Sequence, residues 1–271
     1  SRLLNEGFPA MTQVYIRVVL GTILAYLLFR RQIRWKQIVS MPKRDLWILL
    51  SMGTIGFSVA VYFVTIGVLN AKLINVAIIF SSVPFFSYLY AYFFLKKSFD
   101  INLTGLLMVS LLGIAIVSTK SLLPQFAFFG IGEWFTLLAT ATMAWFYVGR
   151  KLLTPHLNTS EITIVVMVIA AASGFLLAGL RGETFSLSAF TNPNVLLGLA
   201  IGGSMNALVN YIEIFAFKHL DVVVGSQILL LDTIFALIFG YLIYAETITP
   251  PELIGGAIVV GSVYIANRLP Q

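Results

Sequence analysis

A series of long apolar runs constrains this chain more than any other feature of its sequence. A membrane-spanning helix needs about 20 mainly apolar residues, whereas a strand of a membrane barrel is about half as long and alternates in polarity. The runs here are continuous and have the length of a spanning helix, so they predict an all-α polytopic membrane protein. Nine transmembrane helices are expected, over 11–29, 46–68, 72–95, 101–119, 129–150, 161–180, 194–217, 221–244 and 252–268.

Composition excludes the main alternatives to a membrane protein. Of the 271 residues, 59% are hydrophobic and 10% are charged, against about 45–50% and about 25% in soluble domains. These fractions exclude a disordered chain and an ordinary soluble enzyme. There is no Cys, so a disulfide-stapled secreted domain is also excluded. The net charge of +6 does not indicate nucleic-acid binding, because the positive residues lie in connections between apolar runs. The expected partners are the lipid bilayer and a small molecule.

The distribution of Lys and Arg predicts how the chain is oriented. Twelve of the 17 basic residues fall in one set of connections and four in the other. Cytoplasmic connections carry the excess of positive charge, so we expect the larger set, and with it the C-terminus, to be cytoplasmic. The expected location is the cytoplasmic (inner or plasma) membrane. The twelve residues are Arg30, Arg31, Arg34, Lys36, Lys43, Arg44, Lys96, Lys97, Arg150, Lys151, Lys218 and Arg268.

The chain also contains a weak internal repeat. A shift of 149 residues aligns 53–97 with 202–246 and places Tyr62 on Tyr211. This similarity predicts two copies: 1–120 with four helices, and 129–268 with five. A further helix before the first residue would complete a ten-helix plan. Because five is an odd number, the two copies are expected to be inverted in the membrane.

Four short motifs follow one another along nearly the whole chain. They are Asn5-Glu6-Gly7-Phe8-Pro9 leading to Arg17, Val83-Pro84-Phe85, Leu231-Asp232-Thr233 before Ala245-Glu246-Thr247, and Leu253-Ile254-Gly255-Gly256. Together they resemble the motifs of a known family, the EamA-type members of the drug/metabolite transporter superfamily. The resemblance implies ten helices in two repeats and the export of small metabolites. The sequence departs from the family at Thr233, where Pro is usual, and at Lys97, where an acidic residue is usual.

Polar residues inside a span are costly and are therefore candidates for function. Asn206, Asn210 and Glu213 follow one another at helical spacing and are expected to share one face of a helix. We expect this stripe to contact substrate, with Glu213 also a candidate for proton coupling or gating. The alternatives are hydrogen bonding between helices and a solvated Glu213 near the cytoplasmic end.

Two further charged residues lie deep in the predicted spans. Asp232 is expected near the middle of 221–244, where it is a candidate for substrate binding and for carrying a proton. The alternative is a structural pair. Arg17 is the only positive charge well inside a span. It is a candidate for gating, either as a counter-ion of Asp232 or Glu213 or as a contact of a substrate carboxylate.

Three more residues are candidates for substrate contact. Tyr62 and Tyr211 correspond in the two copies and are expected to line a cavity and stack on substrate. Asn75 lies early in the third span. Glu133 is better explained as a carboxylate at a helix N-terminus than as part of a cavity mouth.

These observations predict a secondary transporter of small organic metabolites, such as amino acids, that works by alternating access. The family resemblance implies that it is an exporter, and coupling to protons is a further expectation. The alternatives are an intramembrane enzyme using buried carboxylates, which the absence of Cys and of an H-E-x-x-H motif disfavours, and a passive channel, for which no ring of like groups is seen. A sensor would need larger loops. No catalytic residue, metal or cofactor is expected, and the chain is expected to be a monomer or a homodimer.

Overall fold

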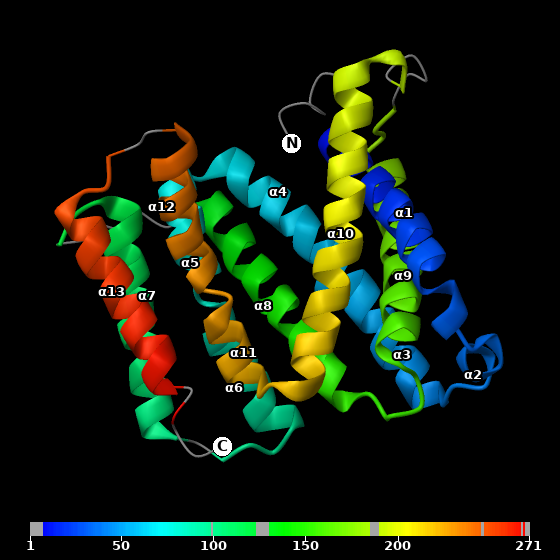
Figure 1. The fold of residues 1–271 in the computed structure, drawn as a ribbon, viewed down its shortest axis with the longest axis horizontal. Coiled ribbons are helices and arrows are strands. Elements are labelled where there is room, and N and C mark those ends of the chain that lie inside the picture. Colours follow the sequence, from blue (N-terminus) through cyan, green and yellow to red (C-terminus); the bar gives the residue numbers. More distant parts are fainter. Residues whose placement is uncertain are drawn as a thin grey trace. The chain divides into compact units, whose positions relative to one another are not determined.

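The structure is a computed structural model that describes residues 8–98, 100–122, 130–184, 190–244, 247–266 and 268. These residues are helical wherever they are regular, which confirms the prediction of an all-α chain (Figure 1). Contacts between residues divide the chain into two compact units, Ser1–Tyr62 with Trp145–His219 and Phe63–Ala144 with Leu220–Gln271. They are called unit 1 and unit 2 below.

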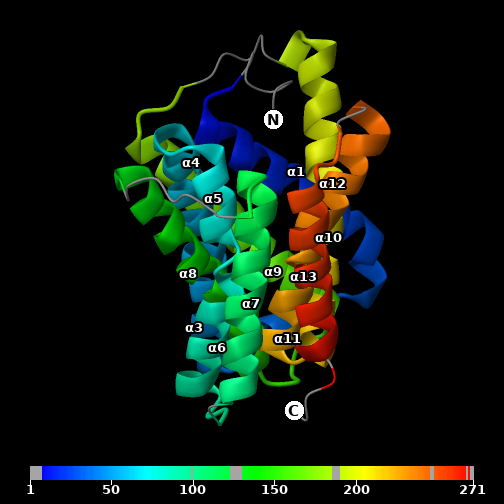
Figure 2. The ribbon, with the colours of Figure 1, turned by 90° about the vertical axis from the view of Figure 1, so that its left-hand side faces the viewer.

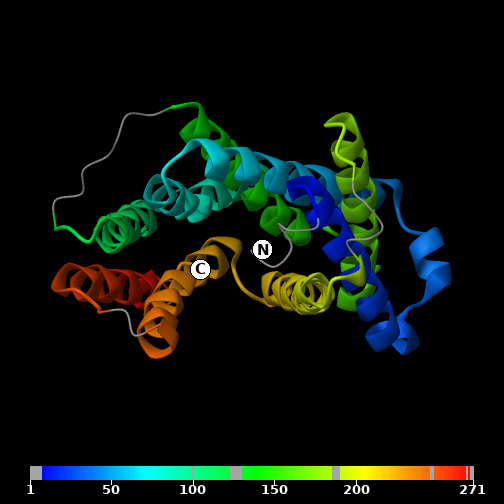
Figure 3. The same cartoon turned by 90° about the horizontal axis from the view of Figure 1, so that it is seen from above.

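Unit 1 is built around one central helix. α1 packs against both α9 and α10, as Figure 1 shows, and Figure 3 looks almost along α10 (yellow) beside α1 (blue). Val18, Ile164 and Met167 belong to the buried cluster between these helices. The helices that lie wholly in unit 1 are α1 (Ala10–Phe29), η2 (Arg30–Gln32), α2 (Trp35–Val39), α3 (Lys43–Ser51), η3 (Met52–Val59), α9 (Thr159–Leu180) and α10 (Pro193–His219).

The predicted span 46–68 is helical throughout, but its middle part is unusual. The segment η3 is a π-helix that joins α3 to α4 (Ala60–Asn70). It packs against α9, where Ser58 Oγ donates a hydrogen bond of 2.9 Å to the Ala170 carbonyl. Insertions of this kind are rare and widen the helix locally.

Unit 2 contains two pairs of short helices, each followed by a longer helix. The first series is α5 (Leu73–Phe80), α6 (Val83–Phe94) and α7 (Ile101–Thr119), and the second is α11 (Val222–Ile228), α12 (Leu231–Tyr244) and α13 (Pro250–Ala266). Figure 2 shows α7 beside α13, and α6 packs against α11. The boundary between the two units falls within α4 and within α8 (Ile131–Leu152).

The α7–α13 contact depends on small residues. A Cβ atom added to Gly255 would lie 2.6 Å from the carbonyl oxygen of Gly113, so the two backbones touch directly. Nearby, the hydroxyls of Ser110 and Ser262 are 2.7 Å apart. Small residues and short polar contacts of this kind hold helices together in membranes, where apolar burial alone gives little preference.

Side-chain caps account for several helix starts. Asn158 and Glu161 form a capping box at the start of α9, and Asp100 caps α7. Asp221 caps α11 and also forms an ion pair of 2.8 Å with Lys97, just after α6. Each cap satisfies amide groups that the first turn of a helix leaves without partners.

Six helices in the described part of the chain are long and apolar enough to cross a membrane. The other predicted spans are also helical: α8 covers 129–150 closely, and α13 covers most of 252–268. Two predictions of continuous helices are wrong, because 72–95 and 221–244 are each interrupted. The six candidates are Met11–Gln32, Lys43–Asn70, Asn75–Phe94 (through its interruption), Ile101–Thr119, Thr159–Leu180 and Pro193–His219.

Candidate functional site

The first interruption in unit 2 lies at Ser81 and Ser82, between α5 and α6. Pro84, in the first turn of α6, has no N–H and its ring crowds the carbonyl of Phe80, so an uninterrupted α-helix is disfavoured here. The chain makes tighter bonds instead, such as Ser82 N–H to the Ile79 carbonyl at 2.9 Å. The predicted span 72–95 is therefore divided by a complete break.

The second interruption lies between α11 and α12, and it corrects the expected position of Asp232. The α-helix stops at Ile228 and begins again at Leu231, so Asp232 sits in the first turn of α12 rather than in the middle of a helix. Its carboxylate accepts a hydrogen bond of 3.2 Å from Thr233 Oγ1. A carboxylate at a helix N-terminus is favoured by the helix dipole, which lowers the cost of a negative charge at this depth.

The two interruptions correspond under the shift of 149 residues. Ser81 and Ser82 align with Leu230 and Leu231, and the helices on either side begin and end within one residue of their counterparts. The break in the second copy occurs although Thr233 stands where Pro84 stands in the first. The same local backbone design therefore occurs twice with different residues.

Beside the second break lies a polar side chain that the sequence analysis did not select. Gln227, in the last turn of α11, is fully buried, and neither its amide nitrogen nor its amide oxygen has a hydrogen-bond partner among the described residues. Ser87 of α6 is also fully buried with its hydroxyl unpaired within the same part of the chain. A buried amide without a partner costs about 1–3 kcal/mol. The only sign of this residue in the sequence was a single side-chain amide within a mainly apolar seven-residue helix.

Asn75, in the first turn of α5, is hydrogen-bonded to a neighbouring helix. Its amide donates a hydrogen bond of 2.8 Å to Glu133 Oε1, and both side chains are buried. Glu133 also accepts a bond of 3.0 Å from the Gly130 N–H, at the start of α8. This geometry agrees with the interpretation of Glu133 as a helix N-terminal carboxylate, and it occupies one donor of Asn75.

The predicted stripe on α10 is present, and it continues as a chain of hydrogen bonds. Asn206 donates to the Gly202 carbonyl and Asn210 to the Asn206 carbonyl, each at 2.9 Å. The amide oxygen of Asn210 is buried and unpaired among the described residues. Glu213 accepts a hydrogen bond from another helix, because the Tyr147 hydroxyl of α8 lies 3.4 Å from its Oε1. The stripe therefore keeps acceptor groups free for another partner.

Arg17 lies at the beginning of this stripe. Its Nε donates a bond of 3.2 Å to the Gln13 carbonyl, and its side chain packs so closely on Gly202 that an added Cβ there would lie 2.5 Å from Arg17 Cδ. None of the ion pairs between described residues includes Arg17, so the expected pairing with Glu213 is not seen within unit 1.

The two corresponding tyrosines have different neighbours. Tyr62 lies under the guanidinium of Arg181, 5.5 Å from its ring centroid. Tyr211 stacks on Phe29 with ring centroids 4.4 Å apart. Both belong to unit 1. Of the predicted site residues, the structure thus groups Arg17, Asn206, Asn210 and Glu213 along α10 and places Asn75 and Asp232 in unit 2.

Comparison with known proteins gives an identity to this arrangement. A profile described as the EamA-like transporter family matches residues 1–119 and 130–268. A WAT1-related protein of Arabidopsis thaliana, described as chloroplastic, is 23% identical over 197 residues, which are 70% of this chain and 47% of that protein. The chain thus spans about half the length of that relative. Of the family motifs, Asn5 to Gly7 and Ala245 to Glu246 lie outside the described residues.

A solved crystal structure has the same fold. It matches with a TM-score of 0.76 over 97% of this chain and 90% of its own, at 14% sequence identity. At that level of identity the likeness shows the fold alone.

Proposed function

Because this chain belongs to the EamA-like transporter family, we propose that it is a secondary carrier that exports small organic metabolites, such as amino acids or related compounds, across the cytoplasmic membrane. The family consists of multi-pass membrane transporters rather than enzymes, so the alternative of an intramembrane enzyme is not pursued. The proposed carrier has its C-terminus in the cytoplasm and works as a monomer or a homodimer.

The observation that carries this proposal is the pair of interrupted helices in unit 2. Secondary carriers built from inverted repeats bind substrate where discontinuous helices occur in corresponding positions of the two copies. The breaks at Ser81–Ser82 and Leu229–Leu230 have this relation to within one residue. They support two inverted copies, 1–120 and 129–268, and transport by alternating access.

The residues beside the breaks define the class of substrate that we propose. Gln227 offers one donor group and one acceptor group in an apolar helix, and Ser87 offers a hydroxyl. Asp232 provides a negative charge at the start of α12. An amide, a hydroxyl and a carboxylate among apolar side chains fit a small zwitterion, whose amino group pairs with the acid and whose carboxylate accepts from the amide.

A second group of residues belongs to the proposal in unit 1. Asn210 and Glu213 offer acceptors on α10, and Arg17 offers guanidinium N–H groups at the start of the stripe. We assign to Asp232 and Glu213 the carriage of protons, and to Arg17 the gating of the site. Tyr62, Tyr211, Asn75 and Asn206 complete the proposed substrate contacts.

The test is transport by the purified protein in proteoliposomes loaded with a labelled amino-acid mixture, with and without a pH gradient. Gln227→Ala is expected to slow transport about 10-fold, the effect of losing a hydrogen bond to a charged group. Ser226→Ala is the matched control, because Ser226 is the neighbouring buried residue and its hydroxyl already bonds to the Val223 carbonyl. Equal rates in both variants, or no flux of any amino acid in the wild type, would contradict the proposal.

A further inference from the structure

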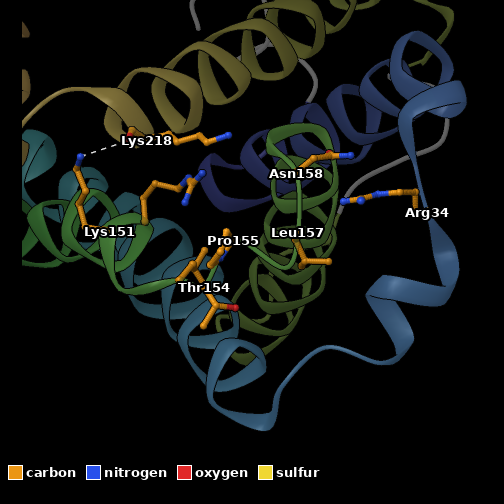
Figure 4. Close-up of a pocket in the computed structure, with 9 residues that line it drawn as sticks. Arg34, Lys151, Thr154, Pro155, Leu157, Asn158 and Lys218 are labelled. Carbon is orange, nitrogen blue, oxygen red and sulfur yellow. Dashed lines mark hydrogen bonds between the residues drawn. The ribbon is translucent and has the colours of Figure 1, made fainter.

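Unit 1 contains a cavity of about 300 Å³ that is separate from the residues assigned to transport. It lies where the end of α8, its connection to α9 and the end of α10 come together, with Arg34 on the opposite side (Figure 4). Four of its lining residues are cationic: Arg34, Arg150, Lys151 and Lys218. The others are Leu153, Thr154, Pro155, Leu157 and Asn158.

The carboxylates in contact with the lining are already engaged. The side chain of Glu161 is fully buried. Its carboxylate accepts hydrogen bonds of 2.9 Å from Nε and from a terminal nitrogen of Arg34. These hydrogen bonds raise the pKa of Arg34 above its ordinary value. Asp45, also buried, accepts the backbone N–H of Thr154 at 3.3 Å and the Thr154 hydroxyl. Neither acid is paired with Arg150 or Lys218 in the described part of the chain.

Arg150 is the central group of the cavity. It is only 7% exposed, yet among the described residues its guanidinium has one hydrogen-bond acceptor, the Ile214 carbonyl, 3.2 Å from Nε. Lys151 Nζ donates to the Lys218 carbonyl at 3.2 Å (Figure 4). The Lys218 carbonyl lies in the last turn of α10, where cations are favoured, and the Ile214 carbonyl lies one turn earlier. These bonds use one N–H of Arg150 and leave both of its terminal NH₂ groups available.

Three cations that share one small cavity repel one another, and a bound anion reverses that cost. The geometry points to a site for a phosphate group, carried either by an anionic phospholipid or by free phosphate. A phosphate presents several acceptor oxygens at once, which suits the forked N–H groups of Arg150 together with two lysine ammonium groups. A volume of about 300 Å³ is at the lower end for small-molecule pockets and accommodates a phosphate with a short polar substituent.

The experiment measures thermal unfolding of the full chain in a nonionic detergent. One arm compares sodium phosphate with sodium chloride at equal ionic strength, and the other compares short-chain phosphatidylglycerol with short-chain phosphatidylcholine. We expect a saturable rise in Tm with phosphate, with phosphatidylglycerol or with both, because a ligand that binds the native state stabilises it. Arg150→Gln is expected to weaken that binding about 10-fold or more.

Two further variants keep the test decisive. Lys218→Gln changes an exposed side chain and is expected to lower the affinity in the same direction, so the result does not depend on the folding of Arg150→Gln. Lys36→Gln removes the same charge from an exposed residue of unit 1 outside the cavity and is expected to bind as the wild type does.

The two arms distinguish the source of the phosphate. A response to phosphatidylglycerol alone assigns the site to a lipid head group, as is typical of basic pockets on the cytoplasmic side of membrane proteins. A response that includes inorganic phosphate assigns it to the phosphate group itself. The inference is overturned if neither probe differs from its control, or if Arg150→Gln and Lys218→Gln bind as tightly as Lys36→Gln. Transport assays do not enter this test, so its failure leaves the proposed carrier function untouched.

Discussion

The break between α5 and α6 coincides with a proline, whereas the break between α11 and α12 does not. Pro84 excludes a helical hydrogen bond for a covalent reason, but Thr233 has an N–H and bonds to the Leu230 carbonyl at 3.3 Å, in a tight turn. The same interruption thus persists with a different residue at the corresponding position. We conclude that packing within unit 2 maintains the break and that the proline reinforces it in only one copy.

The residues at the two helix starts differ as well. Under the shift of 149, Val83 at the start of α6 corresponds to Asp232 at the start of α12. Val83 is buried and apolar, whereas Asp232 is exposed and charged. The first break therefore interrupts the helix without adding a charge, whereas the second also places a carboxylate at the start of α12. We expect substrate binding and proton transfer to depend more on the second break.

The largest expected effect follows from removing that charge. Asp232→Asn keeps the size of the side chain but loses the titrating carboxylate, so transport driven by a pH gradient is expected to fall about 10- to 100-fold. Substrate exchange is also measured without a pH gradient. Exchange at the wild-type rate would show that Asp232→Asn affects proton coupling and not substrate binding. Val83→Ile, at the corresponding position of the first break, is the control and is expected to transport normally. A pH-driven rate in Asp232→Asn equal to that of the wild type would remove the distinction between the breaks.

A smaller effect is expected where the helices that follow the two breaks meet. With one residue inserted after the segment aligned by the shift of 149, the sequence repeat places Gly105 of α7 on Gly255 of α13. A Cβ at Gly105 would meet nothing within 4 Å, whereas one at Gly255 would meet the Gly113 carbonyl. Gly255→Ala is therefore expected to destabilise the protein by about 1–3 kcal/mol through overpacking.

Gly105→Ala is the matched control, and its effect on stability is expected to have the opposite sign. Gly105→Ala fills open space and removes a flexible helix residue, which is expected to stabilise the protein by about 0.5–1 kcal/mol. The midpoint of unfolding in detergent measures both variants. If the two midpoints move in the same direction, α7 and α13 do not touch through Gly255 in the way described.

The smallest effects concern the proline itself. Pro84→Ala is expected to cost about 0.4–1 kcal/mol, mainly because the unfolded chain gains freedom, and to leave transport unchanged. Thr233→Pro gives the second break the residue usual in the family and is expected to cost about 1 kcal/mol. Most of this cost comes from the lost backbone bond to the Leu230 carbonyl, because the second lost bond, from Thr233 Oγ1 to Asp232, is exposed. Unfolding midpoints and transport rates are measured together. Inactivity of well-folded Pro84→Ala would show that the proline alone produces the first break.

Apolar runs are sufficient to predict where the helices lie, because the cost of exposing polar backbone to lipid leaves few alternatives. The sequence 101–119 is helical over the expected range. The break at Leu229 and Leu230 is not predictable in this way, since leucine is a good helix former and the cause lies in tertiary packing. The charge of Asp232 was identified from its depth, but its position in a first helical turn was not.

The candidate contacts show a similar limit. Spacing predicted that Asn206, Asn210 and Glu213 share a face, and their bonds follow one another along α10. Spacing did not reveal that Asn75 is bound to Glu133, because that pairing joins residues 58 positions apart. Nor did it reveal the burial of Gln227, which depends on what surrounds α11 in three dimensions.

The contact between α7 and α13 has a consequence for how the protein is made. Ser110 and Ser262, whose hydroxyls meet there, are 152 positions apart in the chain. At about 5–20 residues per second, α7 emerges from the ribosome roughly 8 to 30 s before its partner exists. During that interval the surface of α7 around Gly113, which later packs on Gly255, can contact only lipid, an insertion factor or a temporary neighbour. The time until α13 is synthesised therefore limits how quickly unit 2 can be completed.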